Sequence, residues 1–331
     1  MDIMEFCQKV KKNLAADMGE GTVLSVKQIT KNNGVMLHGI TVSRDGMNVS
    51  PNIYMDALYK AYENGETFRA VMDEVRKLYR ESKVEASVDM SFFLDYEKMK
   101  DKVVYKVIGY ERNKELLRQV PHVLFLDMAL VFYCHVPQKE LGSATILVYN
   151  SHLKMWGITK EHLYWDAQKN TPQILPARIL SMEDMMKEVC SMDITELGEP
   201  AEKRKKNSAE EQRNEQMKNM GKTEEESASD SGFRMGGRMF VLGNEKKLFG
   251  AAAMFYRGVV EEFSDEIGKS LFILPSSLHE VILVPDDGFQ EAEELWRMVC
   301  EINETQVEPE DVLTDSVYYF SRKCKKIKKL F

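Results

Sequence analysis

Serine, histidine and aspartate lie close together in one short stretch of the last third of the chain. Ser277 and His279 follow an apolar run, and Asp286 ends the next one. A hydrolytic triad uses these residue types, with histidine as the base, serine as the nucleophile and an acid that orients the histidine. However, the Gly-x-Ser-x-Gly turn of such enzymes is missing, and alternation along strands points neighbouring side chains to opposite faces. We therefore favour a polar turn between two strands, with a hydrolase using Ser277 and His279 as the alternative.

A second group of candidate residues lies in the stretch Asn150-Ser-His-Leu-Lys-Met-Trp-Gly. We expect it to connect a buried strand to a helix, and such connections often carry binding residues because the scaffold fixes them while leaving them open. Asn150, His152 and Trp156, together with Ser277 and His279, form the predicted ligand or partner patch. The alternative, which we favour for Trp156, is that this side chain packs into the core. A hydrolase centred on His152 is a further alternative.

Metal and cofactor sites have weaker signals. Cys134 and His135 are adjacent. On a strand their side chains point to opposite faces, so they are poorly placed to bind the same metal ion. His152 and His162 lack the His-Glu-x-x-His spacing. The glycine-rich stretch Gly232–Arg238 lacks both the P-loop ending and the Gly-x-Gly-x-x-Gly spacing of phosphate-binding loops. The sequence therefore predicts no metal and no cofactor.

The last residues of the sequence are strongly basic. Six positive side chains occur in 322–331: Arg322, Lys323, Lys325, Lys326, Lys328 and Lys329. Such a tail could contact nucleic acid, an acidic protein or anionic lipid, although a solvated terminus is the common outcome. The net charge of −8 argues against a general duplex-DNA binder. Nucleic-acid association through this tail is therefore a weak alternative function.

Composition indicates a globular chain with a substantial core. The sequence has 331 residues, of which 44% are apolar and 30% charged. The start of the chain lacks the apolar region of a signal peptide. The most apolar run, 123–136, contains Asp127 and is too short to span a membrane. Five scattered cysteines without a Cys-x-x-Cys pair suit a reducing compartment. We predict a cytoplasmic protein without a membrane span.

The N-terminal part, 1–82, shows the periodicity of one small module. A hairpin is expected around Asn32-Asn33-Gly34, because Asn-Gly supplies the positive φ that a tight turn requires. Ser50-Pro51 is typical of a helix start, with serine as the cap and proline in the first turn. The expected elements are a helix over 3–14, strands over 22–30 and 35–43, and helices over 51–64 and 68–79.

Beyond residue 83 the apolar pattern becomes typical of buried strands joined by helices. Expected strands cover 103–110, 123–135, 144–149, 239–242, 271–274, 280–285 and 316–321. Expected helices start at Thr159 and Ser181, each with a capping residue, and cover 248–263 and the stretch after Asp287. We predict an α+β fold, in which a helix–hairpin–helix–helix module precedes a mixed β-sheet domain with helices.

A charged segment interrupts this domain. Residues 199–232 contain no Val, Ile, Leu, Phe, Tyr or Trp, so they cannot bury enough apolar area to offset the entropy of ordering. We predict a disordered insertion there, with a solvated helix over 209–219 as the alternative. The strands on the two sides are too few to stand alone, so we expect 83–198 and 233–321 to share one sheet and form one domain.

Six short motifs along the chain resemble those of a known family. They are Asn32-Asn-Gly-Val, Ser50-Pro-Asn-Ile-Tyr, Asn150-Ser-His-Leu-Lys-Met-Trp-Gly-Ile-Thr, Asn170-Thr-Pro, Leu274-Pro-Ser-Ser-Leu-His-Glu-Val-Ile and Asn303-Glu-Thr. The chain resembles the bacterial family called domain of unknown function 5688, over nearly its whole length except the insertion. More distantly, the order of elements is similar to that of YtpQ-type proteins, which implies a shared α/β architecture. Neither resemblance implies catalytic residues.

Taken together, the residues favour a non-catalytic cytosolic binding or interaction protein. Several buried elements are well formed in the sequence pattern, whereas no catalytic, metal or nucleotide motif is complete. The expected partner is another protein.

Overall fold

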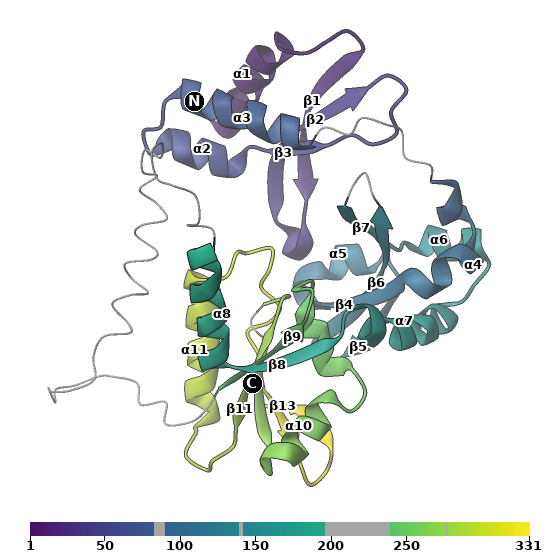
Figure 1. Cartoon of the computed structure of the whole chain (residues 1–331), viewed down its shortest axis with the longest axis vertical. Coiled ribbons are helices and arrows are strands. Elements are labelled where there is room, and N and C mark those ends of the chain that lie inside the picture. Colours follow the sequence, from purple (N-terminus) through teal and green to yellow (C-terminus); the bar gives the residue numbers. More distant parts are fainter. Residues whose placement is uncertain (83–89, 139–141, 196–238, 276) are drawn as a thin grey trace, which may run out of the picture.

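The computed structural model describes residues 1–82, 90–138, 142–195, 239–275 and 277–331. The predicted insertion, 199–232, lies outside the described residues. Three sheets and their helices make up the described chain, with the N-terminal module at one end and two sheets in the body (Figure 1). The α+β class predicted from the sequence is confirmed. Among the helices that the structure describes, none combines the length and the apolar character that a transmembrane segment requires.

The N-terminal module has a core of its own. Its sheet has the order β1-β2-β3, and α1 packs against β1 and β2. Phe6, Val10, Ile40 and Val75 are fully buried, or nearly so, within this core. The elements are α1 (Ile3–Ala15), β1 (Thr22–Thr30), η1 (Asn32–Gly34), β2 (Met36–Arg44), β3 (Asn52–Tyr54), α2 (Asp56–Glu63) and α3 (Phe68–Ser82). The expected helix, hairpin and last helix of the module are confirmed.

The predicted start of the second helix, at Ser50-Pro51, is wrong. Residues 52–54 form the strand β3, in which Ile53 pairs with Ile40 of β2. Tertiary pairing and burial of Ile53 outweigh the local preference for a helix. The helix α2 begins only at Asp56, whose carboxylate accepts a 2.7 Å hydrogen bond from the backbone N–H of His38.

The first sheet of the body is built around one long strand, β6. It pairs with β4 on one side and with β5 and β7 on the other. The single strand expected over 123–135 is split by a turn at Leu126-Asp127, where Leu126 has φ 54°. The elements are η2 (Ser91–Leu94), α4 (Tyr96–Met99), η3 (Lys100–Lys102), β4 (Val103–Gly109), η4 (Glu111–Asn113), α5 (Lys114–Leu117), β5 (His122–Phe125), β6 (Met128–Gln138), β7 (Gly142–Leu147), α6 (Asn150–Trp156) and α7 (Lys160–Ile174).

The second sheet of the body joins chain segments from both sides of the predicted insertion. Its order is β13-β12-β10-β11-β9-β8, and Ser181 of β8 pairs with Phe240 of β9. Every strand pair among the described residues is antiparallel, so the body has two antiparallel sheets where one mixed sheet was expected. The elements are β8 (Ala177–Ser181), α8 (Met182–Thr195), β9 (Phe240–Asn244), η5 (Gly250–Phe255), α10 (Val259–Ile267), β10 (Leu271–Leu274), β11 (Val281–Pro285), α11 (Ala292–Thr305), β12 (Tyr318–Ser321) and β13 (Lys326–Lys329).

The helix expected over 248–263 is also different in the structure. A short 3₁₀ helix, η5, ends before Gly258, and α10 starts after it. A side chain at Gly250 would meet the backbone oxygen of His279 at 2.3 Å, so η5 lies against the segment before β11. Gly258 has φ 87°, which interrupts the helix. Close backbone packing, rather than helix propensity, therefore determines the conformation of this region.

One carboxylate ties the two body sheets together. Asp127, in the turn between β5 and β6, accepts hydrogen bonds from Tyr318 and, at 2.7 Å, from Ser316. It also accepts from Thr314 at 3.2 Å and from the Lys329 ammonium at 2.9 Å. Burial by itself raises the pKa of Asp127, but the hydrogen bonds from Tyr318, Ser316 and Lys329 outweigh it, so this pKa lies below its ordinary value.

Replacing Asp127 with asparagine should lower the free energy of unfolding by about 2 kcal/mol at neutral pH, because charge-assisted hydrogen bonds are lost from a half-buried group. The carboxylate has a lowered pKa in the folded state. Its contribution is therefore complete above its unfolded pKa of about 4, and it is lost as the pH falls through the folded value. Denaturant unfolding of both proteins at several pH values measures this difference.

The exposed Asp101 provides the matched control. Asp101→Asn should leave the free energy of unfolding almost unchanged at every pH. A difference between Asp127→Asn and the unmodified protein that stays constant from neutral to acidic pH would contradict the role given to the Asp127 charge.

Candidate functional site

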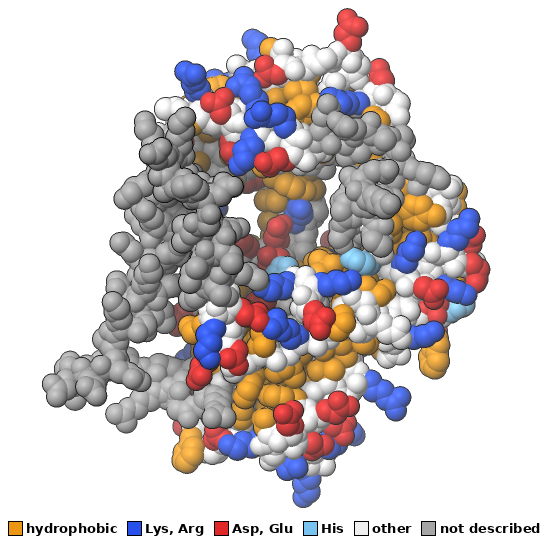
Figure 2. Space-filling model, viewed as in Figure 1, with side chains coloured by type: hydrophobic (Ala, Val, Ile, Leu, Met, Phe, Trp, Pro, Cys, Tyr) orange, Lys and Arg blue, Asp and Glu red, His pale blue; other side chains and the backbone are white. Residues whose placement is uncertain are grey.

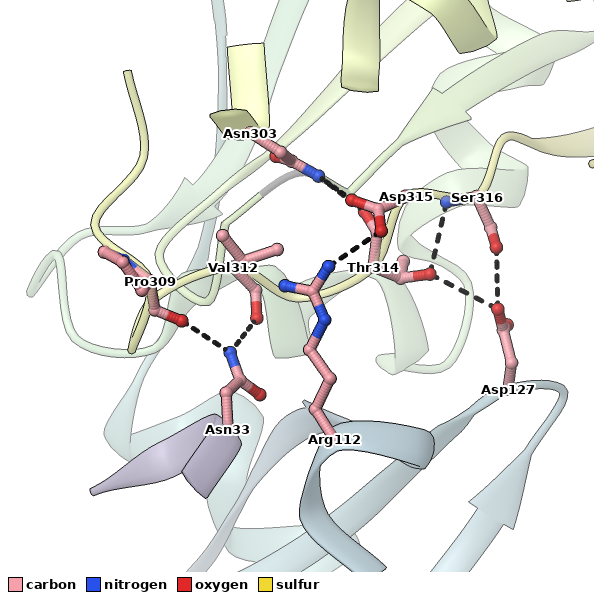
Figure 3. Close-up of polar contacts among 9 residues, drawn as sticks. All are labelled: Asn33, Arg112, Asp127, Asn303, Pro309, Val312, Thr314, Asp315 and Ser316. Carbon is pink, nitrogen blue, oxygen red and sulfur yellow. Dashed lines mark hydrogen bonds and ion pairs between the residues drawn. The ribbon is translucent and has the colours of Figure 1, made fainter. Parts of the chain in front are cut away.

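The tip of the β1–β2 hairpin reaches from the N-terminal module to the body. The side-chain amide of Asn33 donates to the backbone oxygens of Pro309, at 2.9 Å, and Val312, at 2.6 Å (Figure 3). Asn32 donates to the backbone oxygen of Glu310 at 2.8 Å. We call this contact, between 32–34 and 309–312, the hairpin joint. It connects parts of the chain that are far apart in sequence.

A second amide side chain completes the hairpin joint. Asn113, at the end of η4, accepts from the backbone N–H of Asn33 at 2.8 Å. Its own amide donates to the side-chain oxygen of Asn33 at 2.8 Å and to the backbone oxygen of Gly109 at 2.9 Å. Asn33 has φ 60°. The left-handed conformation expected from Asn-Gly thus turns the tip so that backbone and side chain of one residue both bind the body.

A pocket of about 540 Å³ lies beside the hairpin joint. The C-terminal end of α11 and the segment 306–309 form much of its wall, and Arg112 and Asp315 belong to the lining as well. We call it the α11 pocket. Its volume is in the range of sites that hold small molecules or single side chains of a partner.

Asn303 is the most deeply buried polar residue of the α11 pocket. Its side-chain N–H groups donate to the backbone oxygen of Thr314 at 3.1 Å and to the Asp315 carboxylate at 2.8 Å. Arg112 donates to the other oxygen of Asp315 at 2.7 Å (Figure 3). Asn303 is only 7% exposed, and its side-chain oxygen has no partner among the described residues. A buried acceptor left unpaired costs about 1–3 kcal/mol.

The charges around the α11 pocket are mainly negative. Glu304, Glu308 and Asp315 line it together with a single cation, Arg112. The C-terminal end of α11 adds a negative partial charge. Burial, followed by the negative charges of Asp315 and Glu304, raises the pKa of the Cys300 thiol in the same pocket, which disfavours a thiolate nucleophile. The pocket therefore suits a ligand with positively charged N–H donors.

The described residues offer little for metal binding. No group of three or more His, Cys, Asp and Glu side chains within them is arranged to hold an ion. Cys134 and His135 are consecutive residues of β6, so they face opposite sides of the sheet, as expected.

Ser277 and His279 lie near the hairpin joint but are not arranged as nucleophile and base. The Ser277 hydroxyl accepts from the backbone N–H groups of His279, at 3.0 Å, and Glu280, at 3.4 Å, which stabilises the turn. The His279 ring stacks on Phe249, and its Nε2 lies 3.5 Å from the Asp311 carboxylate. In the described residues no contact joins the Ser277 hydroxyl to the His279 ring. The hydrolase alternative stays a prediction without a nucleophile–base pair to support it.

Asn150, His152 and Trp156 belong to α6, and His152 and Trp156 pack against Phe93 of η2. The Trp156 ring nitrogen donates to the backbone oxygen of Phe93 at 2.7 Å, and the rings of Phe93 and His152 also contact each other. Asn150 donates to the backbone oxygen of Arg118 at 3.2 Å. Burial lowers the pKa of His152. The structure thus places the predicted patch in two groups that no described contact connects, and Trp156 is a packing residue.

The basic C-terminal segment is part of the fold rather than a solvated tail. It contains β13, which pairs with β12 at the edge of the second body sheet. Arg322 and Lys325 form ion pairs with Asp265, and Lys329 with Asp127. The remaining cations are Lys323, Lys326 and Lys328. Lysines on an edge strand discourage pairing with another chain, so edge protection explains much of this charge.

The sequence patterns pointed to few of the residues that form this site. Asn303 appeared in the motif Asn303-Glu-Thr, and Arg112, Asn113 and Asp315 carried no signal. The motifs Asn32-Asn-Gly and Asn303-Glu-Thr were visible in the sequence, but their partners depend on contacts between distant segments. These two motifs were the usable signals.

Residues 3–322 match the family described as "Family of unknown function (DUF5688)". The chain belongs to this family. The match includes the module, the first body sheet, the second body sheet except β13, the hairpin joint and the α11 pocket. Among curated proteins and solved structures, no match to this chain was found. The more distant similarity to YtpQ-type proteins stays a prediction.

Replacing Asn33 with glycine should loosen the hairpin joint without disturbing the turn, because glycine tolerates positive φ. The variant loses the side-chain hydrogen bonds to Pro309, Val312 and Asn113. At about 1 kcal/mol for each net hydrogen bond, hydrogen exchange in 309–315 should become at least about tenfold faster. Exchange within α1 should not change, because the module has its own core.

Lys27→Ala, an exposed position on β1, is the matched control and should leave exchange in 309–315 unchanged. Hydrogen exchange measured by mass spectrometry distinguishes the two variants. Unchanged protection of 309–315 in Asn33→Gly would show that these hydrogen bonds do not hold the joint.

Proposed function

We propose that this member of the family is a non-catalytic binding protein of the bacterial cytoplasm and that the α11 pocket is its ligand site. The observation that carries the proposal is a pocket of about 540 Å³ lined by Glu304, Glu308 and Asp315 at the C-terminal end of α11. These carboxylates and the negative end of the helix favour a positively charged ligand group.

The pocket chemistry supports a cationic ligand. Glu304 and Glu308 supply carboxylates to the lining of the pocket. Arg112 and Asp315 already neutralise each other through a 2.7 Å contact. An arginine or lysine side chain of a protein partner brings the N–H donors and the positive charge that these groups require. We therefore propose a protein partner that inserts a basic side chain.

A binding role also fits the state of the groups in the pocket. The Cys300 thiol has a raised pKa, and Arg112 is held by Asp315. These groups are suited to holding a ligand rather than to attacking one.

Glu308→Gln should weaken binding of the tripeptide Gly-Arg-Gly by about fivefold, the effect of losing roughly 1 kcal/mol of charge attraction. Calorimetric titration of the full chain with Gly-Arg-Gly, Gly-Lys-Gly and Gly-Glu-Gly measures the effect. We expect the two basic peptides to bind the unmodified protein, more weakly at high salt. Gly-Glu-Gly should not bind.

Glu301→Gln is the matched control, because Glu301 lies on α11 but does not line the pocket. It should leave the affinity for the basic peptides unchanged. If both variants lose affinity equally, or if the unmodified protein binds no basic peptide, the α11 pocket is not the site.

A further inference from the structure

Lys106 is a part-buried cation on β4, the edge strand of the first body sheet that pairs with β6. Its ammonium lies 4.4 Å from the centre of the Phe249 ring. Within the described residues, no ion pair or hydrogen bond of this ammonium is found. A cation removed from water without an ionic partner costs free energy. An apolar side chain would pack at this position at lower cost, so the lysine requires another explanation.

Asp311 of the hairpin joint and Lys31, which precedes the hairpin tip, act on Lys106. Burial lowers the pKa of Lys106 to about 8; the negative charge of Asp311 opposes this change and the positive charge of Lys31 adds to it. Lys31 immediately precedes the hairpin tip, and its ammonium lies 4.2 Å from the centre of the Tyr54 ring. Asp311 is also shared with His279, at 3.5 Å. The negative charge of Asp311 therefore offsets only part of the effect of burial on Lys106.

The same face of the sheet carries further basic groups. Lys106 and His122 both pair with Val131 of β6, and paired residues of antiparallel strands share a face. His135 lies four residues beyond Val131 on β6 and so has the same orientation. Burial and the positive charge of Lys246 lower the pKa of His135.

An opening lies between the N-terminal module and the body. Figure 2 shows a hollow there, with Lys or Arg and His side chains along its edge on the side of the body. Phe249, which carries the Lys106 ammonium on its ring, has φ 51° and is held between Tyr133 and His279. The ring is thus fixed in place, which keeps the Lys106 ammonium at one position.

We propose that Lys31 and Lys106 bind an anionic group, a phosphate or a carboxylate, that enters between the hairpin and the first body sheet. The anion supplies the counter-charge that Lys106 lacks and removes the repulsion between the two lysines. Because Lys31 belongs to the module and Lys106 to the body, a bound anion also strengthens the contact between them. This site lies on other residues than the α11 pocket and takes a ligand of opposite charge.

Titration of the full chain with inorganic phosphate and, separately, with succinate tests this site. We expect at least one of the two anions to bind, and binding should weaken as the pH rises above about 8, where Lys106 loses its proton. NMR of ¹³C-dimethylated lysines should show the pKa of Lys106 rising when the anion is added. The anion that binds more tightly identifies the ligand group as phosphate or carboxylate.

Lys106→Met and Lys31→Met should each weaken anion binding at least about tenfold, the amount expected from losing one charge-assisted contact. The second variant keeps the test valid if the first fails to fold. Lys323→Met, an exposed lysine, is the matched control and should bind as the unmodified protein does.

Equal binding by Lys31→Met, Lys106→Met and the control, or binding of neither anion by the unmodified protein, would overturn the proposal. Glu308→Gln, in the α11 pocket, should bind phosphate and succinate normally. The two binding tests are therefore independent: failure of the α11 pocket proposal does not affect the anion-binding result, and failure of anion binding does not affect the pocket result.

Discussion

The carboxylate of Asp127 is the interaction on which the arrangement of the body depends. It receives four donors, three of them from the segment 314–318 and one from β13. Two sheets that meet through apolar side chains could slide, because dispersion contacts have little directionality. Hydrogen bonds to one carboxylate fix the register instead. The segment before Thr314 leaves this anchor toward the hairpin joint, so the positions of both candidate sites follow from it.

The segment 309–315 serves several contacts at once. Its backbone oxygens receive Asn32 and Asn33 from the module, and Asp315 holds Arg112 and Asn303 on the side of the α11 pocket. The negative charge of Asp311 also acts on Lys106. This segment therefore contributes to the α11 pocket and influences the proposed anion site. A ligand that moves this segment at either site changes the hydrogen bonds that dock the module.

Local patterns predicted the elements that local forces control. The helical periodicity of α1 and α3, the Asn-Gly hairpin and the Ser181–Asp184 cap agree with the structure. The prediction failed for β3 and η5, where pairing with β2 and close packing against His279 decide the conformation. The site was harder to predict, because Asn33 finds its partners at Asn113 and Val312, which no local pattern relates.

The pairing of β8 with β9 has a consequence for the order of events during synthesis. The module core uses only residues up to Tyr79, so this part can fold while the rest of the chain is still being made. The second body sheet has to wait, because β8 emerges from the ribosome long before β9, and β12 emerges later still. Throughout that interval the hairpin tip lacks its acceptors in 309–312, although Asn113 has already been made. The nascent chain thus exposes the side-chain amides of Asn32 and Asn33 until this later segment emerges.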